Sequence, residues 1–90
     1  MRPVISFKEK VRNLKRVEVY CYQIAYYILQ DEAFATKAAE EALIRLYHDS
    51  VFFEETSEVQ RNFAKKITIH TSIQIKVGKP FLRLVAQVQQ

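Results

Sequence analysis

The residue types that most often perform catalysis or bind metals are scarce in this sequence. It has one cysteine, Cys21, and two histidines, His48 and His70, and their spacing with one another and with Asp49 does not make a metal-ligand set. His48, Asp49 and Ser50 are sequence neighbours, which does not create a catalytic triad. A glycine-rich phosphate loop needs several glycines, and the sequence has one. We therefore expect no enzymatic activity, no metal and no cofactor.

The charged residues are segregated along the chain, whose net charge is +4. Residues 1–30 carry six basic and two acidic side chains, and residues 31–58 carry eight acidic and two basic ones. Residues 59–90 carry six basic side chains and no acidic one. Such segregation creates one surface suited to a polyanion and another suited to a basic protein. Solvated helix faces followed by a basic tail are the alternative explanation.

Length and composition predict one folded domain over residues 1–90. Hydrophobic residues make up 49% of the 90 residues, with one Gly and two Pro, which is too apolar for a disordered chain. The longest uncharged run, 19–30, is shorter than the roughly 20 apolar residues that span a bilayer, so we expect no membrane span. The sequence has a single cysteine, and residues 1–3 are not followed by the long apolar run of a signal peptide. Both features indicate the cytoplasm.

Two antiparallel helices are predicted for the first half of the chain. A first helix from about residue 6 to 29 has one apolar stripe, formed by Leu14, Val17, Cys21, Ile24 and Ile28. Asp31 is a good N-cap for a second helix that runs to about Tyr47. The inner face of this second helix is expected to comprise Ala35, Ala38 or Ala39, Ala42, Leu43 and Leu46. Because the connection is very short and the alanines are small, the two helices should pack closely.

The second half of the chain allows two interpretations. Residues 51–53 form an apolar plug in a predicted loop, and Thr56 or Ser57 can cap a third helix. From residue 67 to 77, however, β-branched residues alternate as in a half-buried strand, and Gly78-Lys79-Pro80 predicts a stop. We expect an all-α, three-helix bundle with a short C-terminal helix or tail. The alternative is an α+β fold with a β-hairpin at 67–88.

One segment resembles a known family. Residues 26–47, YYILQDEAFATKAAEEALIRLY, follow the layout of region 2 of bacterial RNA polymerase sigma factors of the extracytoplasmic-function type. The shared features are an aromatic-rich first helix, a leucine-then-Asp turn, and a second helix with a Glu-rich middle and an apolar-Arg-Leu-aromatic ending. Phe63-Ala64-Lys65-Lys66 is similar to the family's third helix, so the likeness covers roughly residues 10–77.

The resemblance implies a three-helix domain whose second helix binds the basic clamp helices of RNA polymerase while its third helix faces promoter DNA. The implied polymerase-binding residues are Lys37, Glu40, Glu41, Ile44 and Arg45. The candidate DNA-binding residues are Arg61, Lys65, Lys66, His70, Thr71, Gln74, Lys76 and Lys79. A solvated helix face is the alternative for this second set.

Several positions depart from the family pattern. The family usually has Asp at the position of Lys37 and Gln at that of Glu40, and Val59, Lys66 and His70 replace its Trp, Asn and Asp. The loop that would hold a flipped base carries three acidic residues, Glu54, Glu55 and Glu58, which repel DNA. The chain also lacks room for the family's helix-turn-helix domain, so we expect a split factor, a relic, or a regulator that competes for polymerase or another sigma factor.

A second hypothesis is a helical interaction module that has kept the fold and lost promoter function. Apolar residues exposed within 67–77 could pair with a second chain, which would make the protein a homodimer. Four tyrosines on the first helix could stack on bases, but we expect them to pack in the core and at its boundary: Tyr20, Tyr22, Tyr26 and Tyr27. Cys21 should be a small buried hydrophobe.

Overall fold

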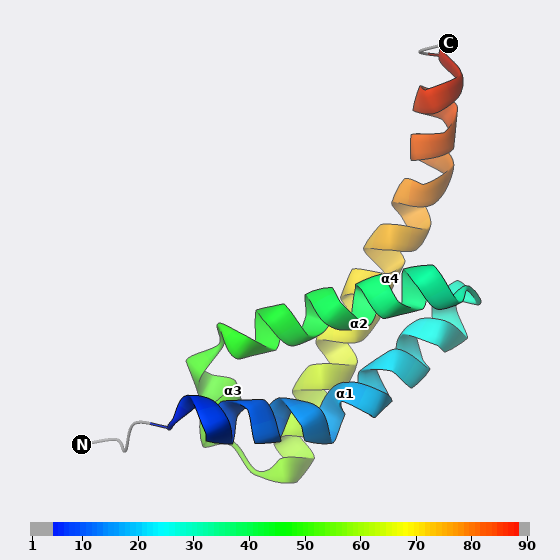
Figure 1. Cartoon of the computed structure of the whole chain (residues 1–90). Coiled ribbons are helices and arrows are strands. Elements are labelled where there is room, and N and C mark those ends of the chain that lie inside the picture. The colour runs from blue at the N-terminus through cyan, green and yellow to red at the C-terminus, as the bar shows by residue number, and fades with distance from the viewer. Residues whose placement is uncertain (1–4, 89–90) are drawn as a thin grey trace.

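The computed structural model describes the backbone of residues 5–88 and the side chains of residues 5–78. This part of the chain forms four helices and no strand: α1 (Phe7–Leu29), α2 (Glu32–Tyr47), α3 (Ser50–Glu54) and α4 (Ser57–Val88). α1 and α2 run antiparallel, α4 crosses and packs against both, and α3 lies at one end of the bundle (Figure 1). The predicted all-α fold built on three long helices is therefore confirmed.

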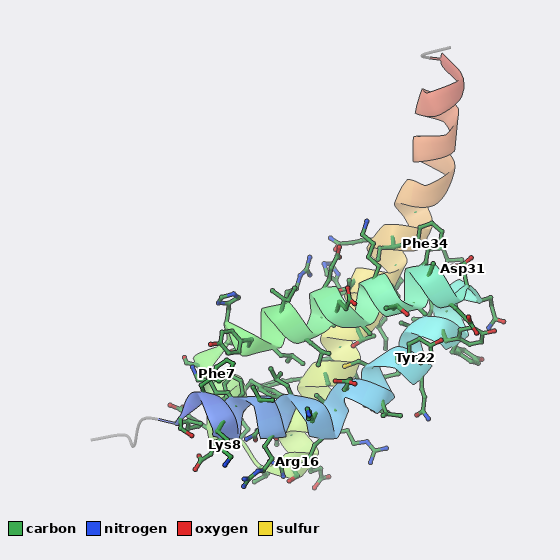
Figure 2. All side chains as sticks on the ribbon, in the orientation of Figure 1. Phe7, Lys8, Arg16, Tyr22, Asp31 and Phe34 are labelled. Atoms are coloured by element: carbon green, nitrogen blue, oxygen red, sulfur yellow. The ribbon has the colours of Figure 1, made fainter. Side chains whose placement is uncertain are left out.

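Each helix begins at a polar side chain that accepts a backbone N–H of its first turn. Asp31 Oδ1 accepts the N–H of Phe34 at 2.9 Å, which confirms the predicted cap of α2 (both residues are labelled in Figure 2). Thr56 Oγ1 accepts the N–H of Val59 at 3.3 Å and so caps α4. Ser6 and Asp49 cap α1 and α3 in the same way. These caps fix where the helices start.

The turn between α1 and α2 depends on Gln30. Its φ of 54° places it in the left-handed region, where its backbone N–H donates to the Tyr26 carbonyl at 2.8 Å and ends α1. The Gln30 side chain donates from Nε2 to the Tyr27 carbonyl at 2.9 Å, which satisfies a second C-terminal carbonyl. The chain therefore reverses direction within two residues, and α2 returns along α1.

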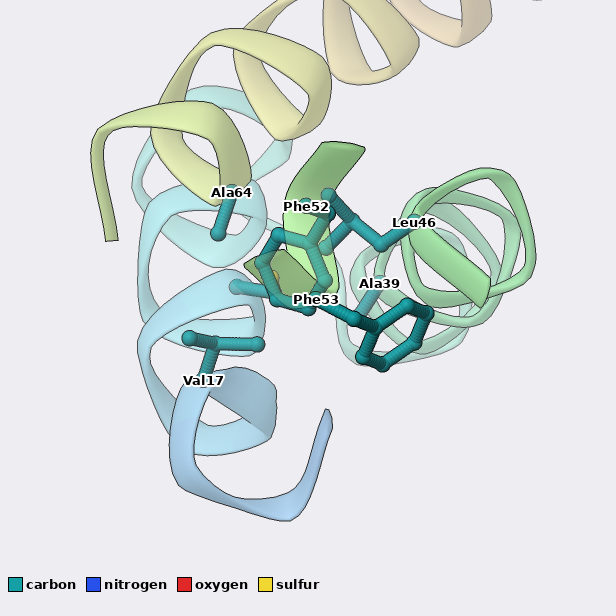
Figure 3. Packing of buried hydrophobic residues seen from close by; sticks show 7 residues of the cluster. Val17, Ala39, Leu46, Phe52, Phe53 and Ala64 are labelled. Carbon is teal, nitrogen blue, oxygen red and sulfur yellow. The ribbon is translucent and has the colours of Figure 1, made fainter. Parts of the chain in front are cut away.

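The main core lies where α1, α2, α3 and α4 meet. Its buried residues are Val17, Cys21, Ala39, Leu46, Phe52, Phe53 and Ala64 (Figure 3). Phe52 and Phe53 contact edge to face, with ring centroids 5.0 Å apart. Cys21 is fully buried, as expected, and this burial raises the pKa of its thiol. The apolar plug at residues 51–53 is thus part of a one-turn helix, α3, rather than of a loop, because Asp49 caps it.

A second buried cluster consists of small residues. Ala25 of α1 and Ala35 and Ala38 of α2 are fully buried, with Ile75 of α4 packed against them. Ala42 is buried as well, so the predicted inner face of α2 is confirmed, with Leu43 partly buried at its edge. Alanine lets neighbouring helices approach closely, and α4 crosses here with small polar side chains, Thr71 and Ser72, fully buried.

The hairpin alternative for residues 67–88 is wrong, and so is the expected break at Gly78. α4 continues as one helix through Pro80 to Val88. In the helix, Ile67 and Ile75 pack against the two clusters, so tertiary packing overrides the strand-like alternation. Gly78 does not adopt the left-handed conformation that would end a helix. The separate C-terminal helix or tail that we expected is therefore a continuation of α4.

A buried glutamine fastens the start of α4 to the other helices. Gln60 is 3% exposed, and its Nε2 donates to Asn13 Oδ1 of α1 at 2.8 Å and to the Phe52 carbonyl of α3 at 3.0 Å. Arg16 Nη2 also donates to Asn13 Oδ1 at 2.8 Å, and its Nη1 donates to Ser57 Oγ at 3.3 Å. This polar network fixes the position of α4 relative to α1 and α3.

The helices in the described part of the chain lack the combination of length and apolarity that crossing a bilayer requires.

Candidate protein-binding and nucleic-acid-binding surfaces

The predicted polymerase-binding residues lie on the side of α2 that faces away from the bundle. Lys37, Glu40 and Ile44 follow one another at three- and four-residue spacing and are exposed, and Glu41 is partly buried beside them. Ile44 is 59% exposed, although its side chain is large and apolar. Together with Arg45, these residues form one continuous surface, called here the α2 stripe (Lys37, Glu40, Glu41, Ile44 and Arg45).

Arg45 connects the α2 stripe to α4. Its Nη2 donates to Gln74 Oε1 at 3.3 Å, and both side chains are exposed. Gln74 was a candidate for DNA contact and Arg45 for protein contact, so the two predicted surfaces meet at the α2–α4 edge. A partner bound to the α2 stripe would therefore lie next to the Gln74 amide.

The candidate DNA-binding residues do not form one surface. Lys66 and His70 are exposed and share one side of α4, and the apolar residues Ile73 and Val77 continue that side at the same spacing. Lys76 is exposed as well. Arg61 and Lys65 lie instead toward α1, as described below. The side chain of Lys79 lies outside the described residues.

Thr71 is misassigned by the sequence prediction. Its side chain is fully buried between α4 and the other helices, so it cannot contact DNA. In the part of the chain that the structure describes, the hydroxyls of Thr71 and Ser72 have no hydrogen-bond partner. Thr68, also fully buried, lies beside the Cys21 thiol. A buried hydroxyl without a partner lowers stability, so Thr71 and Ser72 destabilise this part of α4.

Arg61 and Lys65 face α1 and combine with its tyrosines. The Arg61 guanidinium lies over the Tyr20 ring, 4.5 Å from its centroid, in cation–π geometry. Lys65 lines an open groove with Tyr20 and Tyr27. Tyr27 is 81% exposed and Tyr26 41% exposed, so the expectation that all four tyrosines pack in the core or at its boundary is wrong for Tyr27.

Tyr22 fits that expectation better. It is partly buried, contacts both core clusters, and stacks on Tyr26 with ring centroids 6.1 Å apart. The sequence cannot separate Tyr22 from Tyr27, because both belong to an aromatic-rich helix with apolar residues on more than one side. Tyr22 lies beside Ala39 and Leu43 of α2, whereas Tyr27 lies in an open groove beside α4 and stays exposed.

The acidic residues before α4 are exposed where the family resemblance would place a base-binding loop. Glu55 and Glu58 lie on either side of the Thr56 cap, and Glu58 falls in the first turn of α4. At that position a carboxylate interacts favourably with the positive end of the helix dipole. The same carboxylates repel phosphates, so DNA contact is more favourable farther along α4, beyond Glu58.

The histidine, cysteine and acidic side chains that could act in catalysis or metal binding are not clustered in the described part of the chain. His48 is exposed beside the Tyr47 ring, with centroids 5.3 Å apart, whereas Asp49 caps α3. Within the described residues, no three His, Cys, Asp or Glu side chains come together as a metal-binding group.

Comparison with protein families, curated proteins and solved structures finds no match for this chain.

Proposed function

We propose that the chain is a stand-alone, sigma-factor-like domain that binds RNA polymerase, or a sigma-type or anti-sigma-type partner, through the α2 stripe. It takes part in transcription initiation or in its regulation, and the exposed side of α4 contacts promoter DNA. The domain acts by binding and has no catalytic activity of its own. Its place of action is the cytoplasm, where polymerase works.

This proposal rests mainly on Ile44, an exposed apolar residue that lies next to Glu40 and Glu41. An apolar side chain that is 59% exposed gains free energy when a partner covers it. Glu40 and Glu41 precede it by about one helical turn and favour a basic partner. The family that the sequence resembles binds such a partner, the basic clamp helices of polymerase. An apolar anchor ringed by charges is a common arrangement at protein interfaces.

Support for DNA contact comes from the charge of α4. After Glu58 the sequence contains no acidic residue, and Lys66, His70 and Lys76 are exposed. Contacts of this kind with phosphates release counterions, so DNA affinity should fall steeply as the salt concentration rises. Replacing Lys66 by Gln should weaken binding to all sequences and flatten this salt dependence, because it removes one phosphate contact.

A binding measurement with the purified clamp region of polymerase tests the proposal. The double variant Glu40→Lys/Glu41→Lys should bind at least about tenfold more weakly, because both charges are reversed toward a basic partner. The double variant Glu32→Lys/Glu55→Lys changes the net charge equally but outside the α2 stripe, and should bind like the wild type. Failure of the wild type to bind, or equal losses in both variants, would contradict the proposal.

Replacing Lys37 tests the same proposal through an expected gain, rather than a loss, of affinity for the clamp. The family usually has Asp at this position, so Lys37 places a positive charge on a surface that should face a basic partner. The variant Lys37→Asp should therefore bind the clamp more tightly than the wild type. If it binds more weakly, the partner presents acidic rather than basic residues at this point.

A second candidate function is a homodimeric interaction module. Ile73 is 49% exposed and Val77 70% exposed on the outward side of α4, and such a pair could be covered by a second copy. Light scattering and a salt-dependent DNA titration separate the two functions. A stable dimer that ignores DNA would favour the module, whereas a monomer with salt-sensitive binding to melted promoter-like DNA would favour the sigma-like domain.

A further inference from the structure

α1 and α4 leave an open groove between them, on a different part of the molecule from the α2 stripe. The groove has a volume of about 410 Å³ and is lined mainly by apolar side chains. α1 contributes the polar residue Gln23 and the residues Tyr20, Ile24, Tyr27 and Ile28, and α4 contributes Lys65 and Ile69. The apolar and aromatic α1 residues recur at four-, seven- and eight-residue spacing, so they lie along one side of the helix. Ile24 and Ile28, which were expected on the same apolar stripe as Val17 and Cys21, are only partly buried.

The groove side of α1 is less completely buried than its core side. The buried residues of α1 are Val17, Cys21 and Ala25, whereas Tyr20, Ile24 and Ile28 are only partly buried. Tyr27, in contrast, leaves 81% of its side chain exposed. On α4, Ile73 and Val77 follow Ile69 at four-residue spacing and are exposed too, so the apolar surface extends beyond the groove. Exposed apolar side chains that gather beside a groove are typical of an interaction site.

Positive charges border the groove. Lys65 is part of its lining, and the Arg61 guanidinium lies over the Tyr20 ring. An adjoining hollow of about 350 Å³ shares Tyr20 with the groove and contains Arg61 and Arg16. Arg16, labelled in Figure 2, extends from α1 toward Ser57 at the start of α4. An occupant of the groove therefore meets Lys65 in the groove itself and lies next to Arg61 and Arg16 of the adjoining hollow.

We infer that the α1–α4 groove binds an amphipathic helix of a partner protein, with its apolar stripe in the groove and acidic residues facing Arg61 and Lys65. A groove between two helices is the shape that a third helix fills, and its apolar side chains meet the groove at three- and four-residue spacing. The same groove of a second copy is a poor occupant, because Arg61 and Lys65 would face their own counterparts. This inference goes beyond the proposed function, since neither the α2 stripe nor polymerase is involved.

Two designed peptides provide the probe. Each is constrained to a helix of about 16 residues, because shorter free helices are marginal in water. Both carry the same leucine stripe, and the positions flanking it are Glu in one peptide and Lys in the other. Fluorescence anisotropy with the full chain should show that the Glu peptide binds at least about tenfold more tightly than the Lys peptide. No measurable binding of the Glu peptide, or no preference between the two, overturns the inference.

Variants of the full chain locate the binding. Arg61→Glu/Lys65→Glu should reverse the preference, so that the Lys peptide binds more tightly. Tyr27→Asp should weaken the Glu peptide at least about tenfold by placing a charge in the groove, whereas Tyr26→Asp, next to it but outside the groove lining, should bind like the wild type. Tyr27 is exposed, so its replacement leaves the core intact, which circular dichroism verifies.

Nucleic acid is the competing occupant, and a fluorescent oligo-dT strand tests it. Basic residues with exposed tyrosines also suit single strands, because bases stack on aromatic rings. The inference predicts that Tyr27→Asp leaves any oligo-dT binding unchanged. It is overturned if Tyr27→Asp abolishes binding of oligo-dT while binding of the Glu peptide is unaffected.

Discussion

Replacing Thr71 by Val should stabilise the protein. The Thr71 side chain is fully buried, and its hydroxyl has no partner among the described residues. An unsatisfied buried hydroxyl costs about 1–3 kcal/mol, and valine keeps the β-branched shape while removing it. The methyl group that replaces the hydroxyl adds about 0.8 kcal/mol of apolar burial. We expect a gain of about 2 kcal/mol in the free energy of unfolding.

Thermal and urea unfolding followed by circular dichroism at 222 nm measure this gain. For a domain of this size about 2 kcal/mol corresponds to a rise in Tm of roughly 8–16 °C. The urea midpoint should rise without a change in slope, because the surface exposed on unfolding stays the same.

The same substitution at two other threonines provides matched controls. Thr36 is exposed on α2, so Thr36→Val should change stability by less than about 0.5 kcal/mol. Thr56 caps α4, so Thr56→Val should destabilise the protein by about 1 kcal/mol. If Thr71→Val behaves like Thr36→Val, residue 71 is solvent-exposed and α4 packs with a different face inward. If it destabilises the protein, the hydroxyl has a partner and the reasoning is refuted.

Three further substitutions test other parts of the structure. Gln60→Leu should destabilise the protein by about 1–3 kcal/mol in urea unfolding, because the Phe52 carbonyl loses its side-chain donor, whereas Gln74→Leu on the surface should change little. Gln30→Gly should raise stability by roughly 0.5–1 kcal/mol, since glycine adopts φ 54° without strain; a loss would mean that the Gln30 side-chain bond to the Tyr27 carbonyl outweighs that strain. Burial raises the pKa of the Cys21 thiol above 9.0, so the unfolded chain loses this proton at lower pH than the folded one. The stability that this contributes is complete below pH 9 and is lost as the pH rises further; Cys21→Ala should show a smaller decline above pH 9 than the wild type, and equal declines would exclude the thiol as the cause.

The first half of the fold could be predicted because its signals are local. Asp31 stands directly before an alanine-rich run, and a cap needs a side chain three residues from the N–H that it accepts. The inner face of α2 follows from the spacing of its alanines. Both predictions depend on residues within two turns of one another, so the sequence contains all that they need.

The second half depends on contacts between distant residues. Residues 67–77 fit both a strand and a helix, and the alanines of α1 and α2 decide by giving α4 a close packing surface. Thr71 therefore faces inward although it is polar and lies among basic residues. The partners of Gln60 are 8 and 47 residues away, so no local pattern identifies it.

Of the two candidate surfaces, the one on a single helix could be predicted and the one between two helices could not. The exposure of most of the α2 stripe follows from its place opposite the buried alanines of the same helix, whereas its polymerase-binding role is implied by the family resemblance alone. The α1–α4 groove could not be predicted, because it combines Tyr27 with Lys65, which lie on different helices. Their proximity depends on how α4 crosses α1, and the sequence pattern does not contain that crossing.

The affinity of the polymerase clamp region for two matched variants tests the central claim most directly. Ile44 is the apolar centre of the α2 stripe, and Val51 on α3 is a comparably exposed apolar residue outside it. Ile44→Asp should weaken clamp binding at least about tenfold, because it places a charge in a desolvated contact, whereas Val51→Asp should leave the Kd within about a factor of two. Equal effects of the two substitutions, or no binding by the wild-type chain, would contradict the assignment of the α2 stripe as the protein-binding surface.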